Sequence, residues 1–277
     1  MPNALSSDQF ARNVLDRYNL LTEAGGQLTK SARAESLARG SAMPSTGHPD
    51  FDHLGLGESD FCNGVAVFID LVAFTARTFW DDPGQVVRLN TAVMSQVAAI
   101  VKGFGGYILG LRGDGVFACF GDKSVRDPKV AAAVAMAACA FALDATKNSL
   151  NELLRMSGIR PVQIRAGADY GRLDFVRIGD QDSSEVNVVG FAANFASKCE
   201  KFAMSWEVVV GEGLSNLLPV DYFTGHPSSP KSYTRDGSTK FYRYSNITPS
   251  SLTSYIRHAQ GVQETLDGSP VSSIGYY

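Results

Sequence analysis

The sequence predicts an α+β fold with a βαββαβ core, and three observations support this prediction. An unbroken apolar run at residues 65–69 is typical of a strand that is buried on both faces. The dipeptide Asp114-Gly115 lies between strand-like segments at residues 106–111 and 116–120, which is the strongest short-range signal of a β-hairpin. One long helical segment precedes this hairpin and another follows it. The resulting order of strand, helix, hairpin, helix and strand is that of a ferredoxin-like core.

The first long helix is predicted to begin at Pro83, with Asp82 as its N-cap, and to end at Gly103. Its apolar stripe consists of Val86, Leu89, Val93, Val97 and Ile100. The second helix is predicted at residues 128–154. The remaining elements are predicted as strands at residues 162–169 and 172–178, a helix at 189–202, and strands at 208–210 and 240–244.

The chain divides into a core with an extension at each end. Residues 1–60 form the N-terminal extension, in which residues 7–21 have helical spacing and residues 24–50 are rich in small residues and irregular. Residues 61–247 form the core domain. Residues 248–277 are rich in Ser, Gly and Thr and are expected to be a flexible tail.

The charge balance and the apolar pattern exclude several classes of protein. Lys and Arg total 25 against 28 Asp and Glu, a net charge of −3, and no Lys/Arg-rich run occurs. Nucleic acid and anionic lipid, which need a basic surface, are therefore not expected as partners. The longest apolar stretch, residues 130–143, is shorter than the roughly 18 residues of a membrane span. Because the N-terminus has no signal-peptide pattern, we expect a cytoplasmic protein.

The cysteines and histidines give no metal-binding pattern in the sequence. Cys62, Cys119, Cys139 and Cys199 are widely spaced and include no CxxC pair. Such spacing predicts reduced thiols rather than a disulfide framework or a structural zinc site. The four histidines are scattered without the spacing of metal ligands.

Two aspartates are the first candidates for chemistry. Asp70 closes the buried strand, and Asp114 lies at the hairpin tip. The strand and the hairpin are neighbours in a βαββαβ sheet, so the two carboxylates are expected to meet and to need a counter-charge. Hard divalent cations supply that charge, and a pair of such ions is a common clamp in phosphoryl transfer. Taken alone, each aspartate also fits a simple turn-forming role.

The helix that follows Asp70 offers a place for phosphate. Residues 71–75 lead into this helix, whose first N–H groups and positive dipole end favour an anion, and Thr75 adds a hydroxyl. An ordinary helix start is the alternative.

Four motifs, taken in order, resemble those of the class III nucleotide cyclases. They are Phe-Ile-Asp-Leu-Val-Ala-Phe-Thr at residues 68–75, the Gly-Gly to Gly-Asp-Gly to Phe-Gly segment at 105–121, the Arg-Ala-Gly to Gly-Arg segment at 165–172, and Val-Gly-Phe-Ala-Ala-Asn-Phe-Ala-Ser-Lys at 189–198. Together they extend over most of residues 62–247. The resemblance implies that Asp70 and Asp114 hold two Mg²⁺ or Mn²⁺ ions, with the Leu71 carbonyl as a further ligand.

The same resemblance implies the remaining site residues. Phe74 and Thr75 are expected to contact the substrate at the helix start. Asn194 is expected to orient the ribose, and Lys198 stands where the family usually has Arg; their i,i+4 spacing places both on one helix face. The phosphate contacts are expected from Arg172 and, by a looser match, Arg235. A surface amide for Asn194 and a solvated charge for the basic residues are the alternatives.

In this family two positions read the base, and adenylate and guanylate cyclases each have a typical pair of residues there. This sequence has neither pair. Gly110 has no side chain, and Asn187 offers one donor and one acceptor, which match uracil or, flipped, cytosine. Arg112 lies two residues from Gly110, where a cation favours the acceptor-rich edge of uracil. We therefore expect UTP to be preferred; an ion pair across a dimer is the alternative role of Arg112.

The resemblance further implies a homodimer, because the metal site and the transition-state residues come from opposite subunits in this family. The ribose 3′-OH would attack the α-phosphate without a protein general base. Cyclases that lack both purine pairs resemble the pyrimidine cyclases of Pycsar anti-phage systems, which make cyclic UMP or cyclic CMP as signals. The alternatives are a cytidylate or adenylate cyclase, and a degenerate module that only binds nucleotide. A diguanylate-cyclase-like domain is not expected, because Arg112-Gly113-Asp114-Gly115 does not match its hairpin motif.

Overall fold

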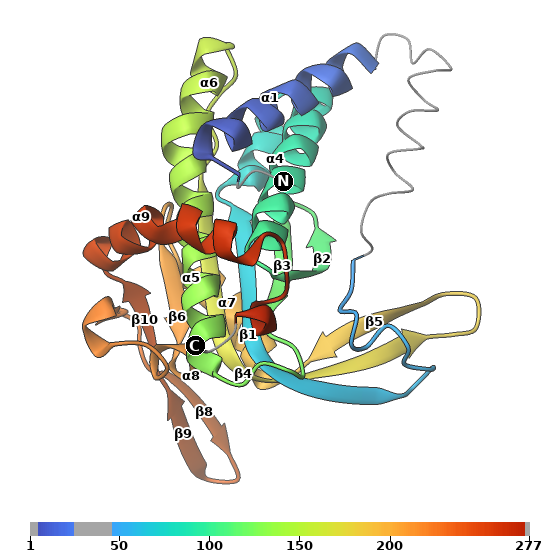
Figure 1. The fold of residues 1–277 in the computed structure, drawn as a ribbon, viewed down its shortest axis with the longest axis vertical. Helices are drawn as coiled ribbons and strands as arrows, with labels where there is room; N and C mark the ends of the chain where they lie inside the picture. Colours follow the sequence, from blue (N-terminus) through green and yellow to red (C-terminus); the bar gives the residue numbers. More distant parts are fainter. Residues whose placement is uncertain (1–4, 25–45, 275–277) are drawn as a thin grey trace.

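The computed structural model describes residues 5–24 and 46–274, and its centre is a mixed β-sheet covered by helices (Figure 1). The sheet has the strand order β2-β3-β1-β4-β6-β10-β7, with β5 paired to β4. Its first strands are β1 (Ser59–Leu71), β2 (Tyr107–Arg112), β3 (Gly115–Phe120), β4 (Ile164–Gly179) and β5 (Ser184–Val189). Its last strands are β6 (Val208–Gly211), β7 (Phe223–Gly225) and β10 (Tyr244–Ile247). The predicted βαββαβ core is confirmed, since β4-β1-β3-β2 is the order of a ferredoxin-like sheet.

Two sets of side chains alternate along β1 and define the two faces of the sheet. Val65, Val67 and Ile69 pack into the large core beneath α1 (Ser7–Ala24), α4 (Pro83–Gly103) and α5 (Pro128–Asp144). Cys62 and Ala66 belong to a second cluster beneath α7 (Phe191–Phe202). This alternation is the period-two pattern of a strand buried on both sides.

The two long helices α4 and α5 begin where the sequence predicts. Asp82 caps α4 by accepting a hydrogen bond from the Gln85 amide at 2.8 Å, and Asp127 caps α5 in the same way from Lys129. Helix α5 continues through a π-helical turn, η1 (Ala145–Leu150), into α6 (Asn151–Met156). This continuous helix is long and apolar enough to cross a membrane. However, 78% of its most apolar stretch of 18 residues is buried inside the protein, where it packs as the central core helix.

Besides elements that the sequence did not predict, such as β5 and β8 (Lys231–Arg235), the structure differs from the sequence-based expectation in three places. The segments predicted as two strands around Tyr170-Gly171 form the single strand β4, because β1 pairs with it without interruption from Ile164 to Val176. The predicted strand at residues 240–244 is divided between β9 (Ser238–Tyr242) and β10.

The third difference is at the C-terminal end, where a flexible tail was expected at residues 248–277. Residues there form α9 (Pro249–Leu266), capped by Thr248 and followed by η3 (Val271–Ser273). Ala259 and Leu266 are buried in the main core, and α9 lies across α5 in Figure 1. Its polar composition reflects the solvent side of an amphipathic helix.

Two structures project beyond the layers. Strands β4 and β5 extend as a long hairpin together with the beginning of β1, and β8 (Lys231–Arg235) pairs with β9 in a separate two-stranded sheet (Figure 1). Three short elements complete the described chain: α3 (Phe74–Trp80), α8 (Glu212–Ser215) and η2 (Val220–Tyr222).

Candidate active site

The carboxylates of Asp70 and Asp114 lie at the same end of the sheet. Asp70 pairs with Gly115 of β3, and the Leu71 amide donates a hydrogen bond to the Asp114 carbonyl at 3.0 Å. Burial raises the pKa of the Asp70 carboxyl, and the negative charge of Asp114 raises it further. Two carboxylates and nearby carbonyl oxygens form an all-oxygen donor set, which fits a hard divalent cation such as Mg²⁺ or Mn²⁺.

Arg165 and Glu200 complete this cluster, and the sequence did not single out either one. Arg165 lies opposite Asp70 in the β1–β4 ladder, and its Nη2 is 3.1 Å from Asp70 Oδ2 and 2.6 Å from Glu200 Oε1. Burial, and then the neighbouring Asp70, raise the pKa of Glu200 to about 7. The signal that could have identified Arg165 was strand register, which aligns Arg165 rather than Arg172 with Asp70.

The start of α3 supports the carboxylates mainly through its backbone. Ala73 has a left-handed conformation with φ of 56°, and the Val72 amide donates to the Gln163 carbonyl at 2.8 Å. Phe74 is buried in the core, so only its backbone faces the site, while Thr75 is exposed. The Leu71 side chain is likewise buried, which leaves its carbonyl as the group available to a cation.

The residues predicted for the transition state, Asn194 and Lys198, lie on α7. The buried face of α7 packs against the sheet and ends with Glu200 beside Arg165. Asn194 is exposed, and Lys198 Nζ lies 5.9 Å from the ring centre of Tyr233 on β8. Gly190 begins the helix with φ of 153°, and a Cβ there would lie 2.7 Å from the Arg172 carbonyl, so this position requires glycine.

Arg172 lies far from Asp70 of its own chain. It pairs with Asn63, seven residues along the ladder from the Asp70–Arg165 pair, which corresponds to roughly 20 Å at about 3.3 Å per residue. Its guanidinium donates to Asp174 at 2.9 and 2.7 Å and lies 3.6 Å from the Phe61 ring centre. Arg235 lies at the end of β8 in the β8–β9 hairpin, where its side chain is 93% exposed and pairs with Asp236.

The two base-reading positions are also separated within one chain. Gly110 pairs with Phe117 next to a bulge in β2, whereas Asn187 pairs with Val176 on the projecting β4–β5 hairpin. Asn187 Oδ1 accepts a hydrogen bond from the Val188 amide at 2.8 Å, and the residue lines a cavity of about 340 Å³. Arg112 ends β2 opposite Gly115; its side chain is outside the described part of the structure.

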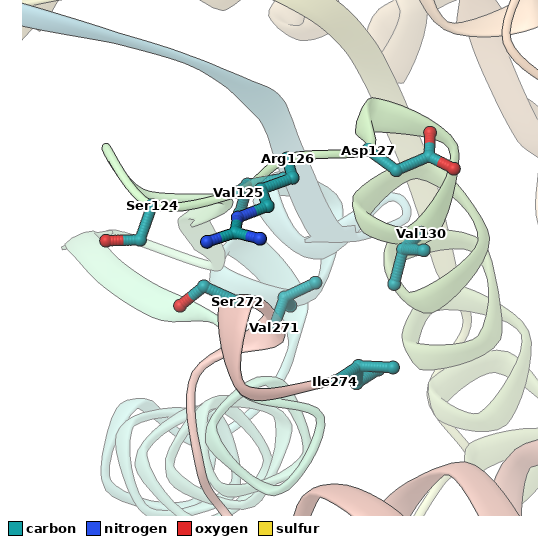
Figure 2. A pocket seen from close by; sticks show the side chains of 8 residues that line it. All are labelled: Ser124, Val125, Arg126, Asp127, Val130, Val271, Ser272 and Ile274. Carbon is teal, nitrogen blue, oxygen red and sulfur yellow. The ribbon is translucent and has the colours of Figure 1, made fainter. Parts of the chain in front are cut away.

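Larger cavities occur elsewhere on the molecule. One of about 370 Å³ lies between the loop before α5 and η3, where Arg126 and Ser272 line it (Figure 2). One of about 410 Å³ lies behind the Leu71–Phe74 segment and is lined by Arg155, Arg160 and Trp206. The first contains none of the predicted site residues, whereas Leu71 and Phe74 are among the residues that line the second.

Comparisons with known proteins agree with this fold. The family model of the adenylate and guanylate cyclase catalytic domain matches residues 60–237, and the chain belongs to this family of class III nucleotide cyclases. The predicted resemblance is thereby confirmed.

Two curated relatives are similar to this chain at 26% sequence identity. A cytidylate cyclase from Escherichia coli is 26% identical over 207 residues, and adenylate cyclase 1 from Rhizobium meliloti is 26% identical over 136 residues. These matches cover 73% and 49% of this chain but only 44% and 20% of the two relatives, so the chain spans less than half of their length.

Solved structures confirm the fold class. The adenylyl cyclase CyaB from P. aeruginosa matches with a TM-score of 0.59 and 21% identity over 69% of this chain and 96% of that one. The guanylyl cyclase Cya2 matches with a TM-score of 0.58 and 18% identity over 70% of this chain and 94% of that one. At this level of identity the agreement concerns the fold alone.

Proposed function

We propose that this protein is a metal-dependent cyclase that converts a pyrimidine nucleoside triphosphate, with UTP preferred, into the 3′,5′-cyclic nucleotide and pyrophosphate. The observation that carries the cyclase proposal is the placement of Asp70 and Asp114 at one end of the sheet, with Arg165 paired to Asp70. These residues offer carboxylate oxygens next to one positive charge, a combination that suits a metal-bound triphosphate.

Each residue has a defined part in the proposed reaction. Asp70, Asp114 and the Leu71 carbonyl would hold two Mg²⁺ or Mn²⁺ ions, and bound ions of this kind lower the pKa of the ribose 3′-OH and neutralise the leaving pyrophosphate. Asn194 orients the ribose, and Lys198 contributes a point charge to the α-phosphate in the transition state. Arg172 contributes a second positive charge, at the phosphates of a substrate held by the other subunit.

The proposed assembly is a homodimer with two composite sites. The support is geometric: Asn194 and Lys198 lie on the outer side of α7, and Arg172 is roughly 20 Å along the ladder from Asp70. A second copy related by a two-fold axis can present these residues to the carboxylates of the first.

Asn187 supports a pyrimidine substrate. Since its Oδ1 is engaged by the Val188 amide, its NH₂ group is the part that donates to a base, and O4 of uracil accepts where cytosine has an amino group. The match to a cytidylate cyclase favours CTP as the second candidate. By its resemblance to Pycsar cyclases, the product would be a cytoplasmic second messenger in antiviral defence.

The test is incubation of the purified chain with each of the four nucleoside triphosphates and Mn²⁺, with the products identified by mass. The proposal expects cyclic UMP as the main product, with less cyclic CMP. Faster conversion of ATP than of UTP at matched concentrations would replace the pyrimidine assignment with an adenylate cyclase. No cyclic product from any nucleotide would support a degenerate nucleotide-binding module.

A further inference from the structure

A cluster of sulfur and imidazole groups lies at the opposite end of β1 from Asp70. Cys62 of β1, Cys119 of β3 and His48 from the segment before β1 place one ligand atom each within 4.8 Å of one another. All three side chains are buried, with exposed fractions of 4%, 0% and 0%. The sequence spacing did not predict a metal site here, because the three residues come from segments that only the folded sheet brings together.

The surroundings leave room for these sulfur atoms. Position 64 of β1 is a glycine, and a Cβ there would lie 3.1 Å from Cys119 Sγ and 3.2 Å from the Phe120 carbonyl. Any larger residue at this position would press into the space beside the thiol. Cys62 also lines a surface cavity of about 350 Å³ together with Asn63 and Lys123, which gives an ion and a water molecule a route to the cluster.

The hydrogen bonds of His48 hold its ring in a form that suits a ligand. Nε2 lies 3.0 Å from the Gly121 carbonyl, to which it must donate, so Nδ1 carries the lone pair. Burial lowers the pKa of His48, which keeps the imidazole neutral. A ring N–H donated to a backbone carbonyl is the usual arrangement of a metal-bound histidine, whereas the 3.3 Å bond from the Asp50 amide to Nδ1 is weak enough to be replaced.

We propose that His48, Cys62 and Cys119 bind one thiophilic metal ion, with Zn²⁺ as the representative ion and a water molecule as the fourth ligand. Thiolate and imidazole are the donors that zinc selects over Mg²⁺ and Mn²⁺. Ligand atoms around a tetrahedral zinc ion lie about 3.5–3.8 Å apart, given bond lengths of about 2.0–2.3 Å. The cluster therefore needs to contract by no more than about 1.3 Å.

The charges of the proposed complex balance. Contact with Cys62 and burial raise the pKa of Cys119, so this thiol carries its proton in the metal-free protein. Binding transfers the two thiol protons to solvent, and Zn²⁺ with two thiolates and a neutral imidazole has no net charge. A neutral complex can be buried without the large cost of an isolated ion.

The ion would connect the segment before β1 to the two strands that carry the carboxylates. His48 lies on that segment, whose Gly47 amide also donates to the Ile108 carbonyl of β2 at 2.7 Å. The aromatic rings of Tyr107, Phe51 and Phe175 surround the imidazole at centroid distances of 4.0, 4.9 and 5.2 Å. Because the site exists only in the folded chain, binding must raise the thermal stability.

The experiment uses the full chain, stripped of metal by a chelator and kept reduced by a phosphine, so that a Cys62–Cys119 disulfide cannot form. Zn²⁺ is added in the presence of excess Mg²⁺, which competes for the oxygen site at Asp70, and bound zinc is counted after desalting. Co²⁺ is added in parallel, because its coordination by thiolate produces a charge-transfer absorption that oxygen ligands do not.

The proposal expects one zinc ion per chain, a higher melting temperature with Zn²⁺ than with Mg²⁺, and the thiolate–Co²⁺ absorption. Cys62→Ser and His48→Gln should each weaken zinc binding at least tenfold. Cys139→Ser, a buried cysteine in α5, is the matched control that should bind zinc normally. Absence of the thiolate–Co²⁺ absorption in the wild-type chain would overturn the proposal without any variant. Equal zinc binding by Cys62→Ser and Cys139→Ser would overturn it as well.

Discussion

The two halves of the proposed active site differ in how completely one chain assembles them. The carboxylate half is closed within the chain: Asp70, Arg165 and Glu200 form ion pairs of 3.1 and 2.6 Å between two strands and a helix. The other half is open. Asn194 faces solvent, Arg172 is occupied by Asp174, and Asn187 lies on a projecting hairpin.

This difference explains why neither half is expected to work alone. Acidic groups that are buried near one another repel, and they need a positive charge beside them in the folded chain. Arg165 or bound cations must therefore supply that charge. Polar groups on an outer helix face are solvated and need no partner in the chain. The residues that remain solvated are therefore the ones available to a second subunit.

The largest expected effect comes from breaking the closed half. Asp70→Asn or Asp114→Asn should lower cyclase turnover about 1,000-fold or more, because a metal ligand loses its charge and several kcal/mol of transition-state stabilisation. Pyrophosphate release with UTP and Mn²⁺ measures this. Asp60→Asn is the control, since Asp60 lies near the other end of the same strand, is half-buried and pairs with Lys123. Near-normal rates in both metal-site variants would refute the assignment.

A mixing experiment tests whether the open half belongs to a second subunit. Asp70→Asn and Asn194→Ala chains, each inactive alone, should recover about a quarter of wild-type activity when refolded or co-expressed in equal amounts. Half of the dimers are then mixed, and each mixed dimer has one intact site of two. Heterodimers isolated by two affinity tags provide the material. If those heterodimers stay inactive, the sites are not shared between subunits.

The sequence predicted the closed half better than the open one for a physical reason. Asp70 and Asp114 lie at the ends of adjacent strands, and topology alone brings such positions together. Arg165 and Glu200 meet Asp70 only through the register of β1 with β4 and the rotation of α7, which local patterns do not fix. The same limit hid the contact among His48, Cys62 and Cys119.

Errors in the fold prediction have a similar origin. Tyr170-Gly171 has the composition of a turn, yet pairing with β1 carries the strand straight through it. The end of the chain was predicted as a flexible tail from its Ser, Gly and Thr content alone. The apolar residues of this segment, including Ala259 and Leu266, fall on one face of α9 and meet the core.

A smaller effect is expected from the base-reading part of the open half. Asn187→Ala should lower the rate with pyrimidine triphosphates by about ten- to two-hundred-fold, the usual effect of losing matched hydrogen bonds in a buried site. Steady-state rates with all four nucleotides, and the Mn²⁺ dependence, measure this. Asn148→Ala is the control, because Asn148 is an exposed asparagine on η1 and does not line the cavity at Asn187. Equal losses for purine and pyrimidine substrates would mean that Asn187 does not read the base.

The smallest expected effect concerns the anchor of the β8–β9 hairpin, which carries Arg235. Tyr242 of β9 donates a hydrogen bond to the buried carboxyl of Asp169 at 3.0 Å, and its oxygen accepts one from the Gly213 amide at 2.7 Å. Burial raises the pKa of Asp169 from 3.8 to about 7, while the bond from Tyr242 favours the ionised form. Between about pH 4 and 7, Asp169 therefore holds a proton in the folded wild-type chain but has lost it in the unfolded chain. For this reason the free energy of unfolding falls as the pH rises through that range.

Tyr242→Phe should therefore destabilise the protein more at pH 8.5 than at pH 5.5. Without the hydroxyl, the pKa of Asp169 rises further, so the variant continues to lose stability above pH 7, where the wild type has stopped. At pH 8.5 the variant should lose about 1 kcal/mol more of its free energy of unfolding than at pH 5.5, which is the difference between a charge-assisted and a neutral hydrogen bond. This corresponds to about 2–4 °C in melting temperature. Tyr233→Phe on the same hairpin is the matched control, because the buried Tyr233 hydroxyl has no hydrogen-bond partner among the described residues. A pH-independent difference between Tyr242→Phe and wild type would show that Tyr242 does not control the ionisation of Asp169, and that the hairpin is held by packing alone.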